Sequence, residues 1–149
     1  MVHGRPHILV LDGAQGVLDL FRDLLEEEGY RVSLSLTAEA GVDLVKELMP
    51  DLVVLDLVLG RRKSGRELLW QLREDPVTAR VLILVCTSAF HLLEEDQERL
   101  IEENVAIIRK PFNIDELLAT IAGCLALRAE RPVLFGLKGG SSTAQWAVG

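Results

Sequence analysis

The chain has 149 residues, of which 49% are hydrophobic and 26% are charged, a balance typical of one globular domain with a substantial core. Its 16 basic and 23 acidic residues give a net charge of −7, which argues against nucleic acid or an anionic membrane as the main partner. We see no apolar stretch of the roughly 18–20 residues that a membrane span needs and no signal-peptide pattern, so we expect a cytoplasmic protein.

The N-terminal part predicts a strand, a helix and a second strand. A mobile start is expected at residues 1–5, and an uninterrupted apolar run predicts a buried strand at about residues 7–11. Apolar residues at helical spacing through residues 17–25 predict an amphipathic helix, which Gly29 is placed to end. Residues 32–36 alternate between apolar and polar, a pattern typical of an edge strand with one wet face.

The next segment leads into a second buried strand. Thr37 is predicted to cap a helix that runs to about Leu48 and stops before Pro50. Residues 52–55 are four consecutive apolar residues, and the run ends on Asp56. An ionised carboxylate there is costly unless it is paired, binds a metal or lies at the open end of the strand. Taken alone, Asp56 is equally compatible with capping a turn.

The remaining elements continue the alternation of helix and strand. We expect a helix, a buried strand, an acidic helix, a short strand and a last helix, at about residues 68–75, 81–86, 92–103, 105–108 and 114–125. Asn113 and Glu116 have the spacing of a capping box at the start of the last helix. From about residue 128 the periodicity fails, and residues 128–149 are expected to form a flexible tail; a docking peptide using Phe135 and Trp146 is the alternative.

Five strands alternating with five helices predict a three-layer α/β domain with right-handed crossovers. The flavodoxin-like (βα)5 arrangement, with parallel sheet order 2-1-3-4-5, places the first and third strands side by side at the point where ligands bind. Both of these strands end in an aspartate, Asp12 and Asp56, and the fourth and fifth end near Thr87 and Lys110. We therefore expect these four side chains to form one site.

With this arrangement, residues 6–127 resemble a response regulator receiver domain. The resemblance lies in the strand ending in Asp12, the segment 50–56, the strand end at Thr87 and the step Lys110-Pro111-Phe112. It implies that Asp56 is the phosphoacceptor, which takes a phosphoryl group from a histidine kinase or phosphotransfer protein.

The resemblance also implies a role for the groups around Asp56. Mg²⁺ would be held by Asp12, Asp56 and the backbone carbonyl of Val58, as suits an ion that takes one or two carboxylates plus phosphate oxygens and waters. Thr87, with Ser88 beside it, would bind the phosphoryl group as part of a switch, and Lys110 would pair with the phosphoryl oxygens.

Several positions depart from the family pattern. Gly13 stands where a second acid usually contacts the metal. The absence of this acidic ligand is expected to weaken Mg²⁺ binding by about 1.5–3 kcal/mol. Gly60 replaces a usual proline, Gly65 lies one residue later than is common, and Ser88 replaces a usual alanine. Ile107 replaces an aromatic switch residue, so the usual aromatic reorientation is not available.

Further residues bear on turnover and partners. Val58 and Ala89 lack polar side-chain groups to orient an attacking water, so an acyl phosphate is expected to hydrolyse slowly. By resemblance, a downstream partner or a second copy of the chain would dock on the face made by the fourth helix, fifth strand and fifth helix. That face includes Glu94, Glu95, Glu98, Arg99, Glu102 and Arg109. An ordinary solvated surface is the alternative.

Two other functions are compatible with parts of this sequence. The first is a pseudo-receiver, which keeps the fold as an interaction module but cannot accept phosphate because Gly13 breaks the acidic pocket. The second is a phosphatase of the haloacid-dehalogenase type, because Asp12 and Gly13 follow an apolar strand; such enzymes need another aspartate where this chain has Ala14. We expect a signalling domain rather than an enzyme.

Overall fold

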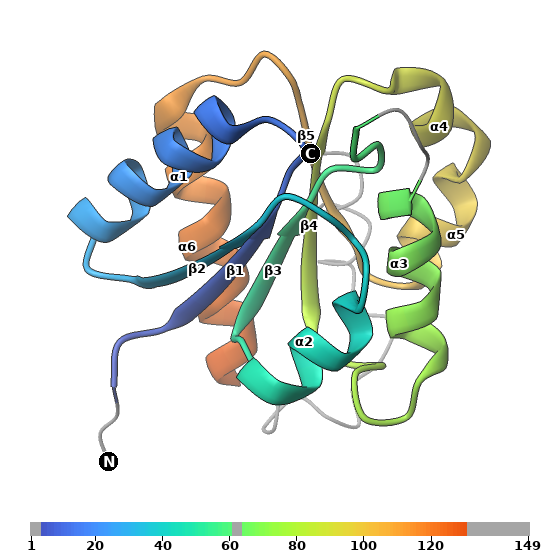
Figure 1. Cartoon of the computed structure of the whole chain (residues 1–149), viewed down its shortest axis with the longest axis horizontal. Helices are drawn as coiled ribbons and strands as arrows, with labels where there is room; N and C mark the ends of the chain where they lie inside the picture. Colours follow the sequence, from blue (N-terminus) through green and yellow to red (C-terminus); the bar gives the residue numbers. More distant parts are fainter. Residues whose placement is uncertain (1–3, 61–63, 131–149) are drawn as a thin grey trace.

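The computed structural model describes residues 4–60 and 64–130, with side chains up to residue 127. Its five strands form one parallel sheet in the order β2-β1-β3-β4-β5, as predicted (Figure 1). The strands are β1 (His7–Leu11), β2 (Arg31–Ser35), β3 (Leu52–Leu55), β4 (Leu82–Thr87) and β5 (Ala106–Arg109). Because every pair is parallel, the carboxyl ends of all strands lie at the same edge of the sheet.

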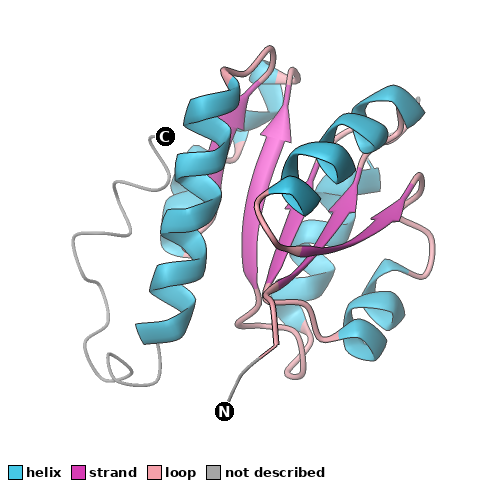
Figure 2. Cartoon of the chain, turned by 90° about the vertical axis from the view of Figure 1, so that its left-hand side faces the viewer, coloured by secondary structure: helices cyan, strands magenta, loops and turns pink. Residues whose placement is uncertain are grey.

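Helices cover both faces of the sheet (Figures 1 and 2). The helices are α1 (Gln15–Glu27), α2 (Gly41–Leu48), α3 (Ser64–Glu74), α4 (Phe90–Glu95), α5 (Gln97–Glu102) and α6 (Ile114–Glu130). Helices α1 and α6 pack on one face, and α2 to α5 pack on the other.

Successive residues of each strand point to opposite faces, and this divides the core into two layers. Leu9 and Leu11 pack with α2–α5, whereas Ile8 and Val10 pack with α1 and α6. All five residues of β1 are buried, as are all four of β3. Burial on both faces explains why these strands read as unbroken apolar runs.

The acidic helix expected over residues 92–103 is divided in two, so the described part of the chain has six helices rather than five. Asp96 ends α4 and begins α5, with a φ of −102° and a ψ of 9°. Its carboxylate is held by Arg66 of α3 in two hydrogen bonds of 2.8 Å. This contact across the fold is not visible in the local periodicity, which continues through the break.

The two predicted helix caps differ in outcome. Glu116 donates its backbone N–H to Oδ1 of Asn113 at 3.0 Å, so the predicted cap of the last helix is confirmed. Thr37 is not the N-cap of the second helix, which begins at Gly41 after Ala40. The Thr37 amide donates to Ser35 Oγ at 3.3 Å instead, so this residue belongs to a turn after β2.

The ends of the chain are described only in part. Residues 1–3 of the expected mobile start and residues 131–149 of the expected tail lie outside the described residues. Helix α6 continues to Glu130. Among the described helices, none has the length and apolar character required to cross a membrane.

Candidate functional site

The site lies at the carboxyl edge of the sheet, where backbone hydrogen bonds extend the strand pairing by one residue. Asp12 donates its N–H to the Ser35 carbonyl at 3.1 Å, and Asp56 donates to the Leu11 carbonyl at 3.1 Å. On the other side, Lys110 donates its N–H to the carbonyl of Thr87 at 2.9 Å. These bonds hold the residues after β1, β3 and β5 in register, so their side chains project from neighbouring positions.

Lys110 joins the two aspartates. Its ammonium Nζ lies 2.6 Å from Oδ2 of Asp12 and 2.8 Å from Oδ2 of Asp56. Both aspartates are buried, with exposed fractions of 4% and 9%. Burial alone would lower the pKa of Lys110, but the hydrogen bonds from its ammonium to both carboxylates outweigh it, and the pKa is raised. Two carboxylates sharing one ammonium leave the cluster with a net negative charge.

Thr87 and the backbone amide of Val58 complete the surroundings of Asp56. The Thr87 hydroxyl donates to Oδ1 of Asp56 at 2.6 Å, and the same oxygen accepts the N–H of Val58 at 3.1 Å. The Thr87 oxygen in turn accepts the N–H of Ala89 at 3.1 Å. In the described chain, every buried side-chain nitrogen and oxygen has a hydrogen-bond partner. The carboxylate of Asp56 is therefore held by three groups: the Lys110 ammonium, the Thr87 hydroxyl and the Val58 amide.

The donor set is suited to a hard divalent cation. Two carboxylates, on Asp12 and Asp56, converge on one point that a positive charge already occupies. Mg²⁺ accepts one or two carboxylates when waters or phosphate oxygens supply the remaining ligands. Within residues 4–60 and 64–130, no group of three or more acidic, histidine or cysteine side chains is placed to hold a metal. The residues therefore fit Mg²⁺ as a site of two carboxylates.

Among the described residues, no side chain at the other predicted positions takes part in the hydrogen bonds of this cluster. Ser88 is exposed, and its backbone carbonyl accepts the N–H of Phe90 at the start of α4. Ile107 is buried in the core layer under α2–α5, with an exposed fraction of 4%. Gly13 is exposed and lies against the backbone of Gly60.

Sequence reasoning missed the way α3 closes over the site. Gly65 packs so tightly on the main chain that a Cβ there would lie 1.8 Å from the carbonyl oxygen of Asp56. The next residue, Arg66, donates its N–H to the carbonyl of Leu57 at 3.0 Å. The spacing of Gly65 alone does not indicate this contact; a glycine in the first turn of the helix that follows the strand ending at Asp56 is the pattern that does.

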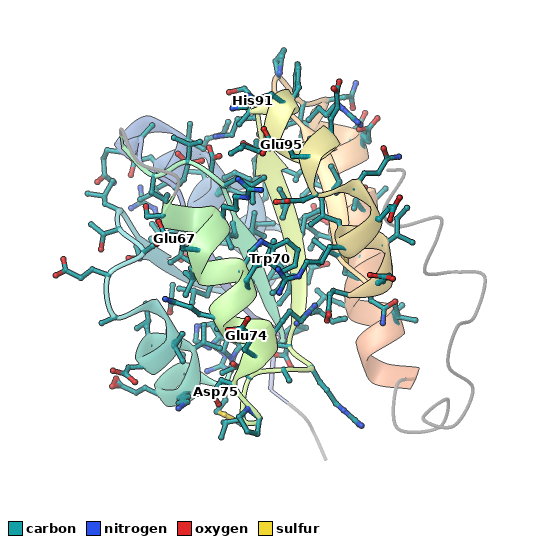
Figure 3. All side chains as sticks on the ribbon, turned by 90° about the vertical axis from the view of Figure 1, so that its right-hand side faces the viewer. Glu67, Trp70, Glu74, Asp75, His91 and Glu95 are labelled. Atoms are coloured by element: carbon teal, nitrogen blue, oxygen red, sulfur yellow. The ribbon has the colours of Figure 1, made fainter. Side chains whose placement is uncertain are left out.

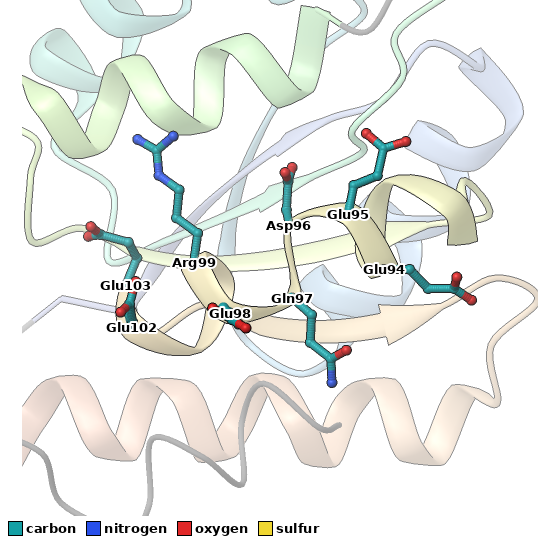
Figure 4. A pocket seen from close by; sticks show the side chains of 8 residues that line it. All are labelled: Glu94, Glu95, Asp96, Gln97, Glu98, Arg99, Glu102 and Glu103. Carbon is teal, nitrogen blue, oxygen red and sulfur yellow. The ribbon is translucent and has the colours of Figure 1, made fainter.

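Helix α3 also holds α4 and α5 through a polar seam, which we define as Arg66, Trp70 and Arg73 with Asp96 and Arg99. Arg66 binds Asp96, and the guanidinium of Arg99 lies 3.8 Å from the centre of the Trp70 ring. Arg73 donates to the backbone carbonyl of Glu103 at 3.2 Å. Figure 3 shows Trp70 on the α3 surface next to α5, and Figure 4 shows Asp96 and Arg99 pointing toward α3.

Comparison with known protein families identifies the class to which this domain belongs. The family model for the response regulator receiver domain matches residues 8–122. The chain therefore belongs to the response regulator receiver domain family. Members of this family are signalling domains that interact with histidine kinases or phosphotransfer proteins and use Mg²⁺ for phosphorylation.

Individual relatives agree with this assignment. The DNA-binding dual master transcriptional regulator RpaA of Synechocystis is 31% identical over 120 residues, which cover 80% of this chain and 49% of that protein. Sporulation initiation phosphotransferase F of Bacillus subtilis is 27% identical, with 82% and 95% covered. The chain thus spans about half of the first protein and nearly all of the second.

A solved structure shows the same fold. The CheY-like response regulator receiver domain protein of Methanospirillum hungatei superimposes with a TM-score of 0.76 at 26% identity, over 86% of this chain and 99% of that one.

Proposed function

We propose that this receiver accepts a phosphoryl group on Asp56 from the phosphohistidine of a histidine kinase or phosphotransfer protein. The observation that supports this most directly is the placement of Asp56 between Lys110 and Thr87, at 2.8 Å and 2.6 Å. Phosphoryl transfer depends mainly on positioning and on neutralising charge, and these two side chains supply both.

In the proposed reaction, a carboxylate oxygen of Asp56 forms a bond to phosphorus while the phosphorus–nitrogen bond of the phosphohistidine breaks. The imidazole leaves with the electron pair of that bond and takes up a proton. The Lys110 ammonium turns from the carboxylate to the phosphoryl oxygens, and the Thr87 hydroxyl becomes a donor to one of them. Mg²⁺, when held by Asp12, Asp56 and the carbonyl of Val58, would neutralise the remaining phosphoryl charge.

A pseudo-receiver is the alternative that one observation favours. Because position 13 is glycine, the described residues bring together two acidic side chains rather than three. Against it, a domain without phosphoryl chemistry has no need for the buried charge cluster of Asp12, Asp56 and Lys110, which is costly to desolvate.

Incubation with acetyl phosphate and Mg²⁺, followed by intact-protein mass spectrometry, separates the two functions. We expect the mass of one phosphoryl group to be gained by the natural chain and by Asp43→Asn, which alters an exposed acid on α2. Asp56→Asn is expected to gain none. No mass gain on the natural chain, with either acetyl phosphate or a phosphorylated histidine phosphotransfer domain, would favour the pseudo-receiver.

The remaining assignments belong to this proposal. The receiver unit would span residues 6–127, with α6 running on to Glu130 before the tail, and would act in the cytoplasm. Its downstream partner, or a second copy, would dock on the face of α4, α5, β5 and α6. Switching would proceed without an aromatic at position 107 and would run from Thr87 through the Ala89 amide to the start of α4.

A further inference from the structure

Gly13, the residue after Asp12, lies directly against the backbone of Gly60. A Cβ built on Gly13 would lie 2.6 Å from the backbone nitrogen of Gly60 and 3.4 Å from the carbonyl carbon of Leu59. The first distance is too short for any side chain, and the obstacle is main chain, which cannot rotate away as a flexible side chain would. The two glycines also line one surface groove together with residues 36–40, which connect β2 to α2, and with residues of α3.

The described residues near Gly60 are held in place on either side of it. Gly60 has a φ of +70°, in the left-handed region that glycine adopts without strain and that the pyrrolidine ring forbids to proline. Leu59, directly before it, is buried in the core layer under α2–α5. After the loop, Gly65 is packed against the carbonyl of Asp56. A side chain at position 13 would have to displace this anchored backbone.

We propose that the backbone of Gly60 fills the space into which a side chain at position 13 would project, so that the carboxylates of the metal site are limited to those of Asp12 and Asp56. Gly13 and Gly60 then act as a pair. The left-handed φ of Gly60 places its backbone nitrogen next to Gly13, and this close contact is possible because Gly13 has no Cβ. Restoring aspartate at position 13 alone does not create a third metal ligand. The metal part of this proposal rests on the proposed function, whereas the steric part does not.

The steric part is tested by alanine substitutions at two glycines and urea unfolding. Gly16, in the first turn of α1, is the matched control because a Cβ there meets nothing within 4 Å. We expect Gly13→Ala to lower the folding equilibrium constant by at least about tenfold. Gly16→Ala should leave it unchanged or raise it up to about fivefold, since alanine is the better helix former. Equal stability of Gly13→Ala and the natural chain would overturn the proposal.

The metal part is tested by titrating Mg²⁺ calorimetrically into Gly13→Asp and Gly16→Asp, which add the same charge at the two sites. We expect the two dissociation constants to agree within about threefold, and Gly13→Asp to be the less stable. Binding at least ten times tighter in Gly13→Asp, with stability retained, would overturn the proposal.

A double substitution tests whether the two positions act as a pair. Gly60→Pro alone should destabilise the fold because proline cannot adopt the left-handed φ. In the variant that combines Gly13→Asp with Gly60→Pro, the proline already moves the backbone at position 60 out of the space that the aspartate Cβ needs. The combined loss in the folding equilibrium constant should therefore be at least about tenfold smaller than the product of the two single losses. Independent effects would overturn the pairing. These readouts need no phosphorylation, so a failed phosphorylation assay would count against the proposed function alone.

Discussion

The hydroxyl of Thr87 donates a 2.6 Å hydrogen bond to Oδ1 of Asp56, and both residues are buried. Replacing this hydroxyl by a methyl group in Thr87→Val removes the donor from a buried carboxylate and the acceptor from the Ala89 amide. We expect a loss of about 1.5–3 kcal/mol in the free energy of unfolding, measured in urea. Thr87→Ser keeps the hydroxyl and should lose clearly less; equal losses would contradict this role for the hydrogen bond.

Lys110→Met should destabilise the fold by about 2–4 kcal/mol at neutral pH, because it leaves two buried carboxylates without their shared cation. Millimolar Mg²⁺ should recover part of the loss, seen as a larger rise in melting temperature than in the natural chain. As the matched control, Lys46→Met removes one partner of a surface ion pair with Asp75 and should change little.

The pH dependence of this stabilisation follows from the direction of the Lys110 pKa. The pKa is raised in the folded state, so the contribution of the ammonium is fully present below the unfolded value of about 10.4. It is lost as the pH rises through the higher folded pKa. The stability difference between the natural chain and Lys110→Met should therefore stay constant from about pH 7 to pH 10 and shrink above it. A difference that falls between pH 7 and pH 9 would contradict the raised pKa.

An acyl phosphate on Asp56 should be long-lived in the absence of a partner. Val58 and Ala89 direct their backbone amides at Asp56 and Thr87, so both lie beside the reacting group, yet neither has a polar side chain to orient water. We expect a half-life of minutes or longer in buffer with Mg²⁺, followed by intact mass after removal of the donor. Val58→Asn should shorten it several-fold, and Val58→Leu should not. Loss within seconds in the natural chain would refute this prediction.

The ion pair between Arg66 and Asp96 should couple α3 to the break between α4 and α5. Its two 2.8 Å hydrogen bonds form a bidentate pair, and the Asp96 side chain is largely buried. A double-mutant cycle of Arg66→Gln and Asp96→Asn should give a coupling energy of about 1 kcal/mol. The exposed pair of Arg22 and Asp19 on α1 is the control and should give little coupling. Equal coupling energies in both cycles would contradict the claim that this ion pair of the polar seam couples α3 to α4 and α5.

The strands could be predicted from short-range patterns, and the position of the site then followed from the order in which parallel strands pair. Unbroken apolar runs identified β1 and β3 as doubly buried, and parallel strands bring the residues that follow them to one edge. Asp12, Asp56, Thr87 and Lys110 meet there for that reason. The convergence follows from topology alone, without any knowledge of side-chain contacts.

What the sequence could not predict depends on contacts between distant segments. The helix is divided at Asp96, whose carboxylate is bound by the guanidinium of Arg66, thirty positions earlier in the chain. The approach of Gly60 to Gly13 depends on how deeply Leu59 enters the core, so the loss of an acid at position 13 looks like a simple deletion until the loop is placed. The Thr37 prediction failed for a local reason: α2 begins only at Gly41, four residues later, and Thr37 lies in a turn in which its amide donates to Oγ of Ser35.

The sheet separates the interior into two layers, since neighbouring residues of each strand face opposite ways. Each layer can therefore be redesigned while the other keeps its native residues. A combinatorial library confined to the inward positions of α1 and α6 would change the packing of one layer alone. The core layer under α2–α5, together with the polar seam, would keep its native residues.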